Sequence, residues 1–196
     1  DDIVWTWSGV RPLCDDESDS PQAITRDYTL DVHDENGQAP LLSVFGGKLT
    51  TYRKLAEHAM EKLSTYYQHI GPAWTKGSVL PGGDIGGDRE AYAAKLRQRY
   101  PFLTEPLARH YARTYGSNSE QLLGEASSLA DLGEDFGHGF HEAELKYLID
   151  CEWVRRADDA LWRRTKQGMW LTDEQRARVD QWLTDYVARH RLSLAS

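Results

Sequence analysis

The pattern of apolar and polar positions divides the chain into a strand-rich first part and a helical second part. β-branched and aromatic residues gather at 3–10, and alternating patterns at 24–33 and 41–45 predict two further strands. Asn36-Gly37 between the last two predicts a β-hairpin, because both residues tolerate positive φ. From Thr50 the apolar positions take helical spacing, which predicts a helix that ends near residues 70–72.

Helix signals dominate the chain after residue 87. Asp88, Thr104 and Thr172 are predicted N-caps, and Pro101 and Gly116 are predicted helix stops. Apolar stripes predict further helices at 119–126, at 142–153, at 154–166 with little separation from the one before, and from 173 onward.

The fold class expected from this pattern is α+β. The Gly-rich segment 81–87 is the predicted domain boundary, because its composition is the most flexible in the chain. Residues 1–80 are then a partial β-sheet with one helix, and residues 88–196 are an all-α unit.

Composition narrows the functional classes. A net charge of −8 over 196 residues argues against a protein that binds nucleic acid through its overall field. Cys14 and Cys151 are the only cysteines, which fits a reducing cytosol and excludes a Cys-rich scaffold or cluster. No apolar run is long enough to cross a bilayer, so any membrane association is expected to be peripheral. The chain begins without Met, and we expect it to be part of a longer protein.

A Gly-Gly-Lys turn between a predicted strand and a predicted helix is the strongest candidate for binding chemistry. Backbone N–H groups at the start of a helix can face an anion, and Lys48 precedes that start. Leu42 and Leu49 occupy positions where a Walker A loop needs Gly and Ser or Thr, so triphosphate hydrolysis is not expected. An ordinary strand–helix turn remains the alternative.

Two other groups of residues have two interpretations each, and a third group is considered as a metal site. Arg11 and Arg26 lie at or within predicted strands, where they can bind a phosphate or pair with neighbouring aspartates. The charge-dense helix 155–166 is either a solvated face with internal Asp–Arg pairs or a Trp-bearing surface for an acidic partner or lipid headgroups. His138 and His141 lack the spacing of a helical zinc pair, and we expect no metal site there.

Three ordered motifs and one helical segment resemble a known family. The motifs are VWTWSGVRPL at 4–13, ITRDY at 24–28 and FGGKLTTYR at 45–53, and the helical segment is DDALWRRTK at 158–166. Together they resemble the aerobic, membrane-associated, FAD-dependent glycerol-3-phosphate dehydrogenases of bacteria. The resemblance extends over essentially the whole chain.

The resemblance implies a reaction and a set of site residues. The family oxidises sn-glycerol 3-phosphate to dihydroxyacetone phosphate, and its FAD passes the electrons to membrane quinone. The resemblance further implies a homodimer in the cytoplasm, held peripherally at the cytoplasmic membrane. It assigns substrate binding to Arg11, Arg26 and Lys48, and cofactor binding to Gly46, Gly47, Leu49 and Thr50.

The chain departs from the family pattern in one respect. The dinucleotide fingerprint Gly-x-Gly-x-x-Gly after a strand is absent from these residues. Residues 1–80 then correspond to the last part of the FAD and substrate domain, and residues 88–196 to the C-terminal domain. No catalytic base is assigned, and the chain alone is expected to be inactive. The alternatives are a non-catalytic helical module for dimerisation, membrane docking or partner binding, and an oxidase that gives electrons to oxygen.

Overall fold

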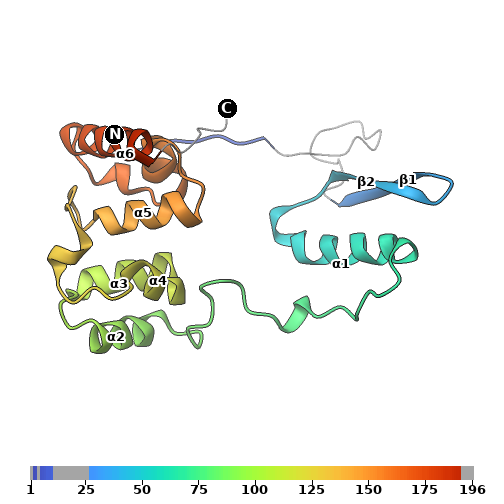
Figure 1. The fold of residues 1–196 in the computed structure, drawn as a ribbon, viewed down its shortest axis with the longest axis horizontal. Helices are drawn as coiled ribbons and strands as arrows, with labels where there is room; N and C mark the ends of the chain where they lie inside the picture. The colour runs from blue at the N-terminus through green and yellow to red at the C-terminus, as the bar shows by residue number, and fades with distance from the viewer. Residues whose placement is uncertain (1, 4, 11–26, 191–196) are drawn as a thin grey trace. The chain divides into compact units, whose positions relative to one another are not determined.

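The computed structural model describes residues 2, 3, 5–10 and 27–190 (Figure 1). Internal contacts divide the chain into two units: residues 6–78, called here the hairpin unit, and residues 1–5 with 79–196, called the helical unit. The predicted α+β class is confirmed, because a small antiparallel sheet precedes a mostly helical remainder.

Among its described residues, the hairpin unit contains two strands, one α-helix and short 3-10 turns. β1 (Tyr28–Glu35) pairs antiparallel with β2 (Gln38–Gly46) in a register that sets Leu30 opposite Val44. Asn36 and Gly37 turn the chain with φ of 59° and 74°, so the predicted hairpin is confirmed.

Helix α1 (Tyr52–Leu63) follows the hairpin through a 3-10 turn at Leu49–Thr51. The Tyr28 ring meets the His58 ring edge to face, with 5.9 Å between centroids, so α1 lies against the face of β1 that carries Tyr28. The prediction of a helix reaching residue 70 was wrong. After Leu63 a 3-10 turn at Ser64–Tyr66 follows, and residues 67–70 are not helical.

The strand expected at residues 3–10 is not formed. Ile3 and residues 5–10 have no regular secondary structure. A strand exists only through hydrogen bonds to a neighbouring strand, and among the described residues β1 and β2 pair only with each other. Strand-like composition alone therefore did not produce a strand at residues 3–10, because no partner strand pairs with them among the described residues.

Local capping signals position the first helices of the helical unit. The Asp88 carboxylate accepts from the Glu90 and Ala91 N–H groups at the start of α2 (Arg89–Arg99). Thr104 accepts from Leu107 N at the start of α3 (Glu105–Thr114). Both predicted N-caps are confirmed. The short α4 spans Ser119–Leu123.

The last helices are confirmed in part. α5 spans Glu142–Cys151 and α6 spans Asp173–His190. At the start of α6 the side chains of Thr172 and Gln175 accept from each other's backbone N–H at 3.2 and 2.8 Å, which forms a capping box and confirms Thr172 as the predicted N-cap.

The helices expected at 142–153 and 154–166 are separated more clearly than predicted. Trp153 takes φ of 58°, and Val154 N donates back to Leu148 O at 3.1 Å, so a left-handed residue ends α5. Trp153 is 78% exposed instead of lying on the buried stripe. The next regular element is a π-helix at Asp159–Arg164.

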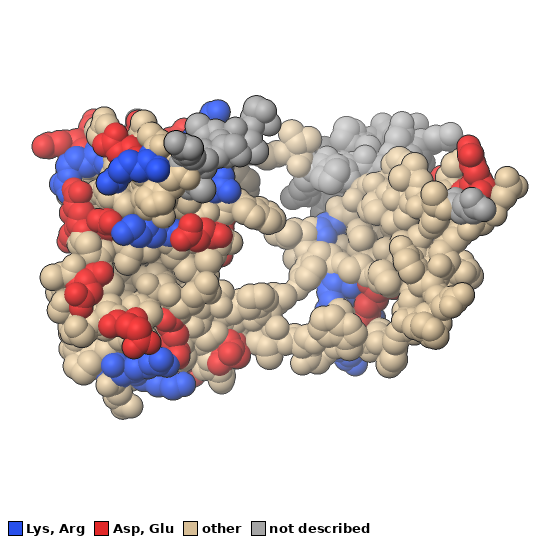
Figure 2. Space-filling model, viewed as in Figure 1, with Lys and Arg blue, Asp and Glu red and all other residues tan. Residues whose placement is uncertain are grey.

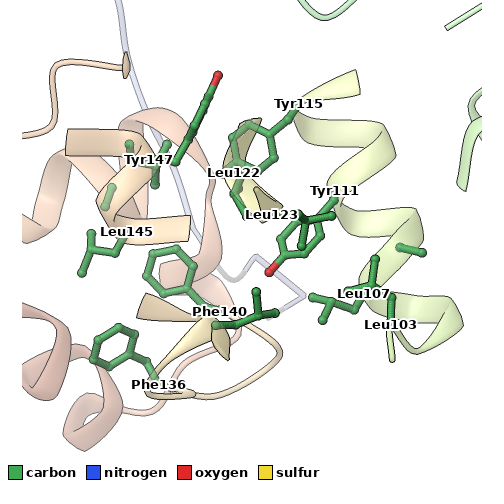
Figure 3. Close-up of a cluster of buried hydrophobic side chains, with 14 of the residues drawn as sticks. Leu103, Leu107, Tyr111, Tyr115, Leu122, Leu123, Phe136, Phe140, Leu145 and Tyr147 are labelled. Carbon is green, nitrogen blue, oxygen red and sulfur yellow. The ribbon is translucent and has the colours of Figure 1, made fainter. Parts of the chain in front are cut away.

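A single apolar core fills the helical unit (Figure 3). Tyr111 of α3, Leu145 of α5 and Val179 of α6 are completely buried in it. Phe136 and Phe140, from the loop before α5, lie 6.0 Å apart between ring centroids, and Trp182 meets Phe136 edge to face. The core therefore joins all the long helices of the unit.

The predicted boundary segment packs closely against the start of α4. A Cβ atom at Gly116 would lie 1.8 Å from Gly82 O, and one at Gly82 would lie 2.5 Å from Tyr115 O. Ser117 N donates to Gly82 O at 3.1 Å. Glycine at both positions lets the two backbones touch, so the segment from Val79 onward belongs to the helical unit.

Candidate functional site

The Gly-Gly-Lys turn joins β2 to the first helical turn before α1. Gly46 and Gly47 have φ of 76° and 94°, a region that L side chains rarely adopt. A Cβ at Gly47 would meet Leu55 and Tyr28 only at 3.5 Å, an ordinary contact. The backbone angle, rather than lack of space, is therefore what requires glycine here.

Lys48 is fixed by its backbone and presents its side chain to solvent. Thr51 Oγ1 accepts from Lys48 N at 3.3 Å and donates to Lys48 O at 3.0 Å. Thr51 N also donates to Lys48 O at 3.0 Å. Leu49 is 89% exposed, and Lys48 and Thr50 are exposed as well. The turn thus holds Lys48, Leu49 and Thr50 in a fixed, accessible arrangement.

The electrostatics of this turn favour an anion. The first turn of α1 contains no acidic residue, so no side-chain carboxylate there offsets the partial positive charge of the helix start. Arg53 is held by Glu57 at 2.7 Å, and Glu57 also accepts from Thr75 Oγ1 at 2.6 Å. The hydrogen bond from Thr75 lowers the pKa of Glu57 and is the largest cause of that shift. Arg53 is thus paired internally.

Five of the seven predicted site residues are brought together by the structure. Gly46, Gly47, Lys48, Leu49 and Thr50 form one turn. Arg11 and Arg26 lie outside the described residues. The hollow found in the hairpin unit, about 990 Å³ between α1 and residues 69–75, is lined by other side chains, among them His58, His69 and Trp74.

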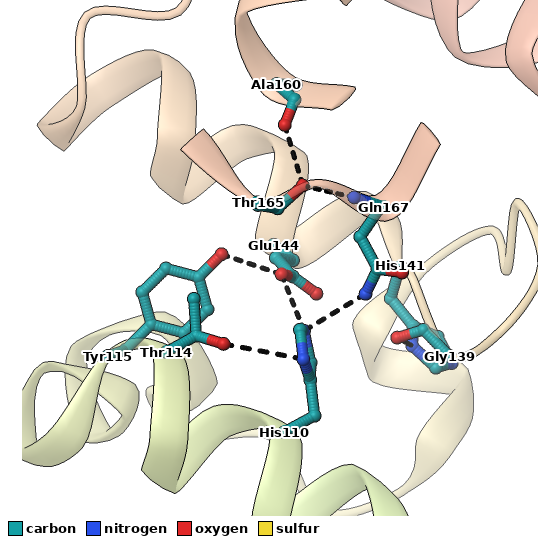
Figure 4. A network of polar contacts seen from close by, with 9 residues as sticks. All are labelled: His110, Thr114, Tyr115, Gly139, His141, Glu144, Ala160, Thr165 and Gln167. Atoms are coloured by element: carbon teal, nitrogen blue, oxygen red, sulfur yellow. Dashed lines mark hydrogen bonds and ion pairs between the residues drawn. The ribbon is translucent and has the colours of Figure 1, made fainter. Parts of the chain in front are cut away.

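A buried polar cluster in the helical unit was not anticipated from the sequence (Figure 4). Glu144 of α5 is completely buried. Its Oε1 accepts from the Tyr115 hydroxyl at 2.6 Å and lies 2.8 Å from His110 Nε2 of α3. Among the described residues, Glu144 Oε2 and the Tyr111 hydroxyl have no hydrogen-bond partner. The cluster joins α3 to α5 through polar contacts inside the core.

The charge of Glu144 controls its neighbours. Burial lowers the pKa of His110, but the hydrogen bond to Glu144 and the charge of Glu144 outweigh burial, and the net effect raises that pKa. Burial and the same carboxylate raise the pKa of Tyr115 well above its usual value. The contact with the Glu144 side chain thus favours the charged form of His110. Because Glu144 is inaccessible, the pair is suited to holding helices together rather than to reacting with a substrate.

One sequence signal pointed to this cluster. Glu144 lies four residues before Leu148, on the same side of α5 as the apolar stripe. A carboxylate on such a stripe requires a partner, because an unpaired buried charge is costly. Its partner His110 is 34 residues away, so the sequence could not identify it.

The charge-dense segment contains the internal pairs of the first interpretation. Asp159 Oδ2 accepts from the N–H groups of Arg155 and Arg156 at 3.0 Å, and Arg163 pairs with Asp159 Oδ1 at 2.9 Å. Arg155 donates through its side chain to the backbone of Ile149 at 3.1 Å. Several charged side chains of this segment are therefore bound to other groups of the same fold. The proposed contact with lipid or an acidic partner is not tested by this geometry.

The two histidines of the loop before α5 point to separate neighbours. His141 Nδ1 lies 2.9 Å from Gly139 O, and the His138 ring lies 5.8 Å from the Trp170 ring. In the described part of the chain, no group of three or more His, Cys, Asp or Glu side chains could hold a metal ion. The same residues include no helix that is both long and apolar enough to cross a membrane.

The described residues of the helical unit are mostly helical and share one core, and a comparison with known families covers most of them. Residues 73–190 match the family described as the C-terminal domain of alpha-glycerophosphate oxidase. The match extends over more than half of the chain, so the chain belongs to this family.

Full-length relatives agree with this assignment. The chain is 81% identical over 196 residues to the aerobic glycerol-3-phosphate dehydrogenase of Escherichia coli strain K12. It is 51% identical over 195 residues to a glycerol-3-phosphate dehydrogenase of Pseudomonas aeruginosa, and 46% identical over 183 residues to a D-erythritol 1-phosphate dehydrogenase of Brucella abortus. The matches span 100%, 99% and 93% of this chain but 39%, 38% and 36% of those proteins. The predicted resemblance is confirmed, and the chain spans about two fifths of the length of these curated relatives.

Proposed function

We propose that this chain is part of a flavoprotein that oxidises sn-glycerol 3-phosphate to dihydroxyacetone phosphate. The observation that carries the proposal is the 81% identity to the Escherichia coli dehydrogenase over every residue of the chain. The relative that acts on D-erythritol 1-phosphate is less similar, at 46%. Both names denote polyol monophosphates, so a site for a phosphate at one end of a short polyol is common to them.

The chain contributes cationic groups for such a substrate. Lys48 is exposed at the Gly-Gly turn, where the helix start adds partial positive charge. Arg11 and Arg26 are proposed to hold the phosphate, since paired guanidinium groups match its oxygens in geometry and charge. Three cations around one phosphate offset the charge of a substrate that carries close to two negative charges at neutral pH.

FAD is the cofactor that we propose for the intact protein. The turn of Gly46 and Gly47 lets backbone approach a flat ring closely, and Leu49 and Thr50 are exposed beside it. The uncompensated helix start stabilises negative charge on a neighbouring ring. When bound, FAD would accept the two electrons that the substrate alcohol loses. The chain's own residues would orient the substrate and stabilise charge around it.

The acceptor, the membrane and the oligomer complete the proposal. We propose that quinone takes the electrons, that the protein associates peripherally with the cytoplasmic membrane from the cytoplasmic side, and that it forms a homodimer. These three points follow from the family resemblance. For the membrane, the proposal is association at the surface, and the described residues include no helix long and apolar enough to span a bilayer.

The function is tested by turnover of the purified intact protein. We expect it to be yellow and to reduce a soluble quinone when glycerol 3-phosphate is added. The same protein with D-erythritol 1-phosphate should turn over more slowly. Consumption of oxygen with production of hydrogen peroxide, at the same rate with and without quinone, would show an oxidase and contradict the proposed acceptor.

Lys48→Met tests the proposed substrate site in the intact protein. Loss of a charge-assisted contact costs about 1.5–3 kcal/mol, so KM for glycerol 3-phosphate should rise roughly ten- to hundredfold. Lys54→Met is the matched control, because Lys54 is exposed on α1 and pairs with Glu57 at 3.3 Å. Arg11→Ala and Arg26→Ala should raise KM in the same way. Equal kinetics for the Lys48 and Lys54 variants would show that the turn is structural.

The second candidate function is a non-catalytic helical module. It is favoured by the apolar core of the helical unit, whose buried residues all belong to that unit. We propose that the chain on its own folds in this unit, binds FAD poorly and turns over no substrate. Size-exclusion chromatography and co-sedimentation with anionic vesicles at low and high salt would detect dimerisation and membrane docking. Stoichiometric yellow colour in the purified chain would contradict the expected loss of FAD.

A further inference from the structure

The chain passes between its two units at two points, and the first of them follows Trp5 directly. Residues 1–5 group with the helical unit, whereas Thr6 to Ser78 form the hairpin unit. Along the described part of this stretch, Ile3, Trp7 and Val10 are all at least 75% exposed, but Trp5 is partly buried. The contacts of Trp5 are therefore what hold the chain at this point.

Two side chains from one segment of the helical unit hold Trp5. The Trp162 ring stacks on the Trp5 ring, with 5.8 Å between centroids and 16° between planes. The Lys166 ammonium lies 4.7 Å from the centroid of the Trp5 ring. Lys166 also donates to the backbone carbonyl of Trp162. Stacking and a cation–π contact thus act on the same indole.

Trp162 is itself fixed by the residues behind it. A Cβ atom at Gly168 would lie 2.6 Å from Trp162 Cζ2, so glycine at 168 leaves the space that the ring occupies. The Arg176 guanidinium lies 5.7 Å from the Trp162 centroid and donates to Gly168 O at 2.6 Å. The partner that Trp5 meets is therefore a rigid surface rather than a free side chain.

The backbone that carries Trp162 and Lys166 departs from regular α-helix geometry. Thr165 N donates to Ala160 O, five residues back, at 3.1 Å, which is the hydrogen bond of a π-helix. Lys166 takes φ of 65°, a left-handed conformation that a lysine adopts at a cost. Gln167 then contacts His110 of the buried cluster, with 3.4 Å between the two Nε2 atoms. The segment that carries Trp162 and Lys166 is thus tied into the core.

We propose that Trp5 is a positioning residue, held by Trp162 and Lys166, through which the helical unit fixes the start of the segment that leads to Arg11. Arg11 follows Trp5 by six residues. The proposal rests on the proposed function, because it gives the helical unit a part in binding the substrate phosphate. Fixing the start of this segment lowers the conformational freedom that substrate binding must otherwise remove.

Hydrogen–deuterium exchange tests the contact without any substrate. In the intact protein, Trp162→Ala should raise exchange in a peptide covering residues 3–10, whose own sequence is unchanged. Trp170→Ala is the matched control, because Trp170 is an exposed Trp of the same unit and its recorded ring contact is with His138. If α5 also exchanges faster in Trp162→Ala, then Trp5→Ala decides the question, since Trp5 lies outside the core.

Steady-state kinetics test the positioning role. Trp5→Ala should raise KM for glycerol 3-phosphate about three- to tenfold, the range that loss of one aromatic pair permits, with kcat nearly unchanged. Trp5→Phe should recover most of the wild-type KM. The double variant Trp5→Ala/Trp162→Ala should have the KM of Trp5→Ala alone, because both changes remove the same contact.

The outcomes separate this inference from the proposed function. Unchanged exchange at residues 3–10 in both Trp162→Ala and Trp5→Ala overturns the contact. Increased exchange with an unchanged KM overturns the positioning role. If the wild-type protein does not oxidise glycerol 3-phosphate, the proposed function fails, and the exchange result still decides whether the helical unit holds this segment.

Discussion

Most of the large apolar side chains of the helical unit lie inside the fold, whereas most of the described ones in the hairpin unit lie at its surface. All but one of the buried hydrophobic residues in the described part of the chain belong to the helical unit, and the exception is Leu30 at 8% exposure. Val44, Phe45 and Tyr52 of the hairpin unit are each about half exposed. In the view of Figure 2, charged side chains are spread over the helical unit, whereas the hairpin unit shows mostly uncharged residues.

This difference shows what each unit needs in order to be stable. Burial of apolar area is the main favourable term in folding, so the helical unit has its own source of stability and the hairpin unit has little. An isolated two-stranded hairpin is marginal in water, and the helix that lies against this one, α1, contains no buried residue. Since the chain spans about two fifths of the length of its curated relatives, we expect the apolar face of the hairpin unit to be covered in the intact protein.

Truncation of one apolar side chain in each unit gives the largest expected contrast. Leu145→Ala removes a completely buried side chain from the core and should lower the free energy of unfolding of the helical unit by about 2–5 kcal/mol. Phe45→Ala removes a half-exposed side chain and should change stability by less than about 1 kcal/mol in the chain studied alone. Urea unfolding followed by circular dichroism measures both.

The same Phe45→Ala substitution sharpens the comparison in the intact protein. If other parts of the protein cover the hairpin unit, the cost should rise toward that of Leu145→Ala. An equally small loss of stability in the chain alone and in the intact protein would show that this face stays exposed. The two units would then differ in the surfaces they present to solvent, not in whether the rest of the protein covers them.

The buried His110–Glu144 pair predicts how stability of the helical unit depends on pH. The pKa of His110 in the folded state is raised above its unfolded value of about 6.5. Its contribution to stability is therefore fully present below pH 6.5 and is lost as the pH rises through the raised pKa. Thermal unfolding between pH 6 and pH 9 should show a falling melting temperature. The hairpin unit has no buried ion pair of this kind among its described residues.

Glu144→Gln should reverse the sign of this dependence. Without the carboxylate, burial of His110 is the remaining effect and lowers its pKa. A histidine whose folded pKa is depressed destabilises the fold as the pH falls, so stability should then rise with pH. Tyr115→Phe, which removes one hydrogen bond to the same carboxylate and leaves its charge, should keep the original sign. The same slope in Glu144→Gln and wild type would show that the pair does not control this titration.

The sequence predicted local features well and long-range ones poorly. Asp88 and Thr104 cap helices through neighbours two or three residues away, and Asn36-Gly37 turns a hairpin by its own backbone preference. The prediction of a strand at residues 3–10 was wrong, because a strand forms only with a partner strand elsewhere in the chain. The Glu144–His110 pair was missed because its two members are 34 residues apart.

The candidate site divides in the same way. The Gly-Gly turn and the exposed Lys48 were predictable, because positive φ and a helix start are properties of adjacent residues. The Trp5–Trp162 stack was not predictable, because its two residues are far apart in the sequence and the stack depends on the space left by Gly168. Convergence of Arg11 and Arg26 with Lys48 is likewise a long-range property, and it stays a prediction.

The smallest expected effect concerns Trp153, the left-handed residue just after the end of α5. It takes φ of 58° at a helix end where glycine is usual, and its side chain is 78% exposed. Trp153→Gly should therefore stabilise the helical unit by about 1 kcal/mol, because the left-handed conformation costs a bulky residue about 1–2 kcal/mol and glycine little. Trp170→Gly is the control, since Trp170 is also exposed but has φ of −102° and should lose stability on becoming glycine. Loss of stability in Trp153→Gly, measured by urea unfolding, would mean that the indole makes contacts worth more than the strain.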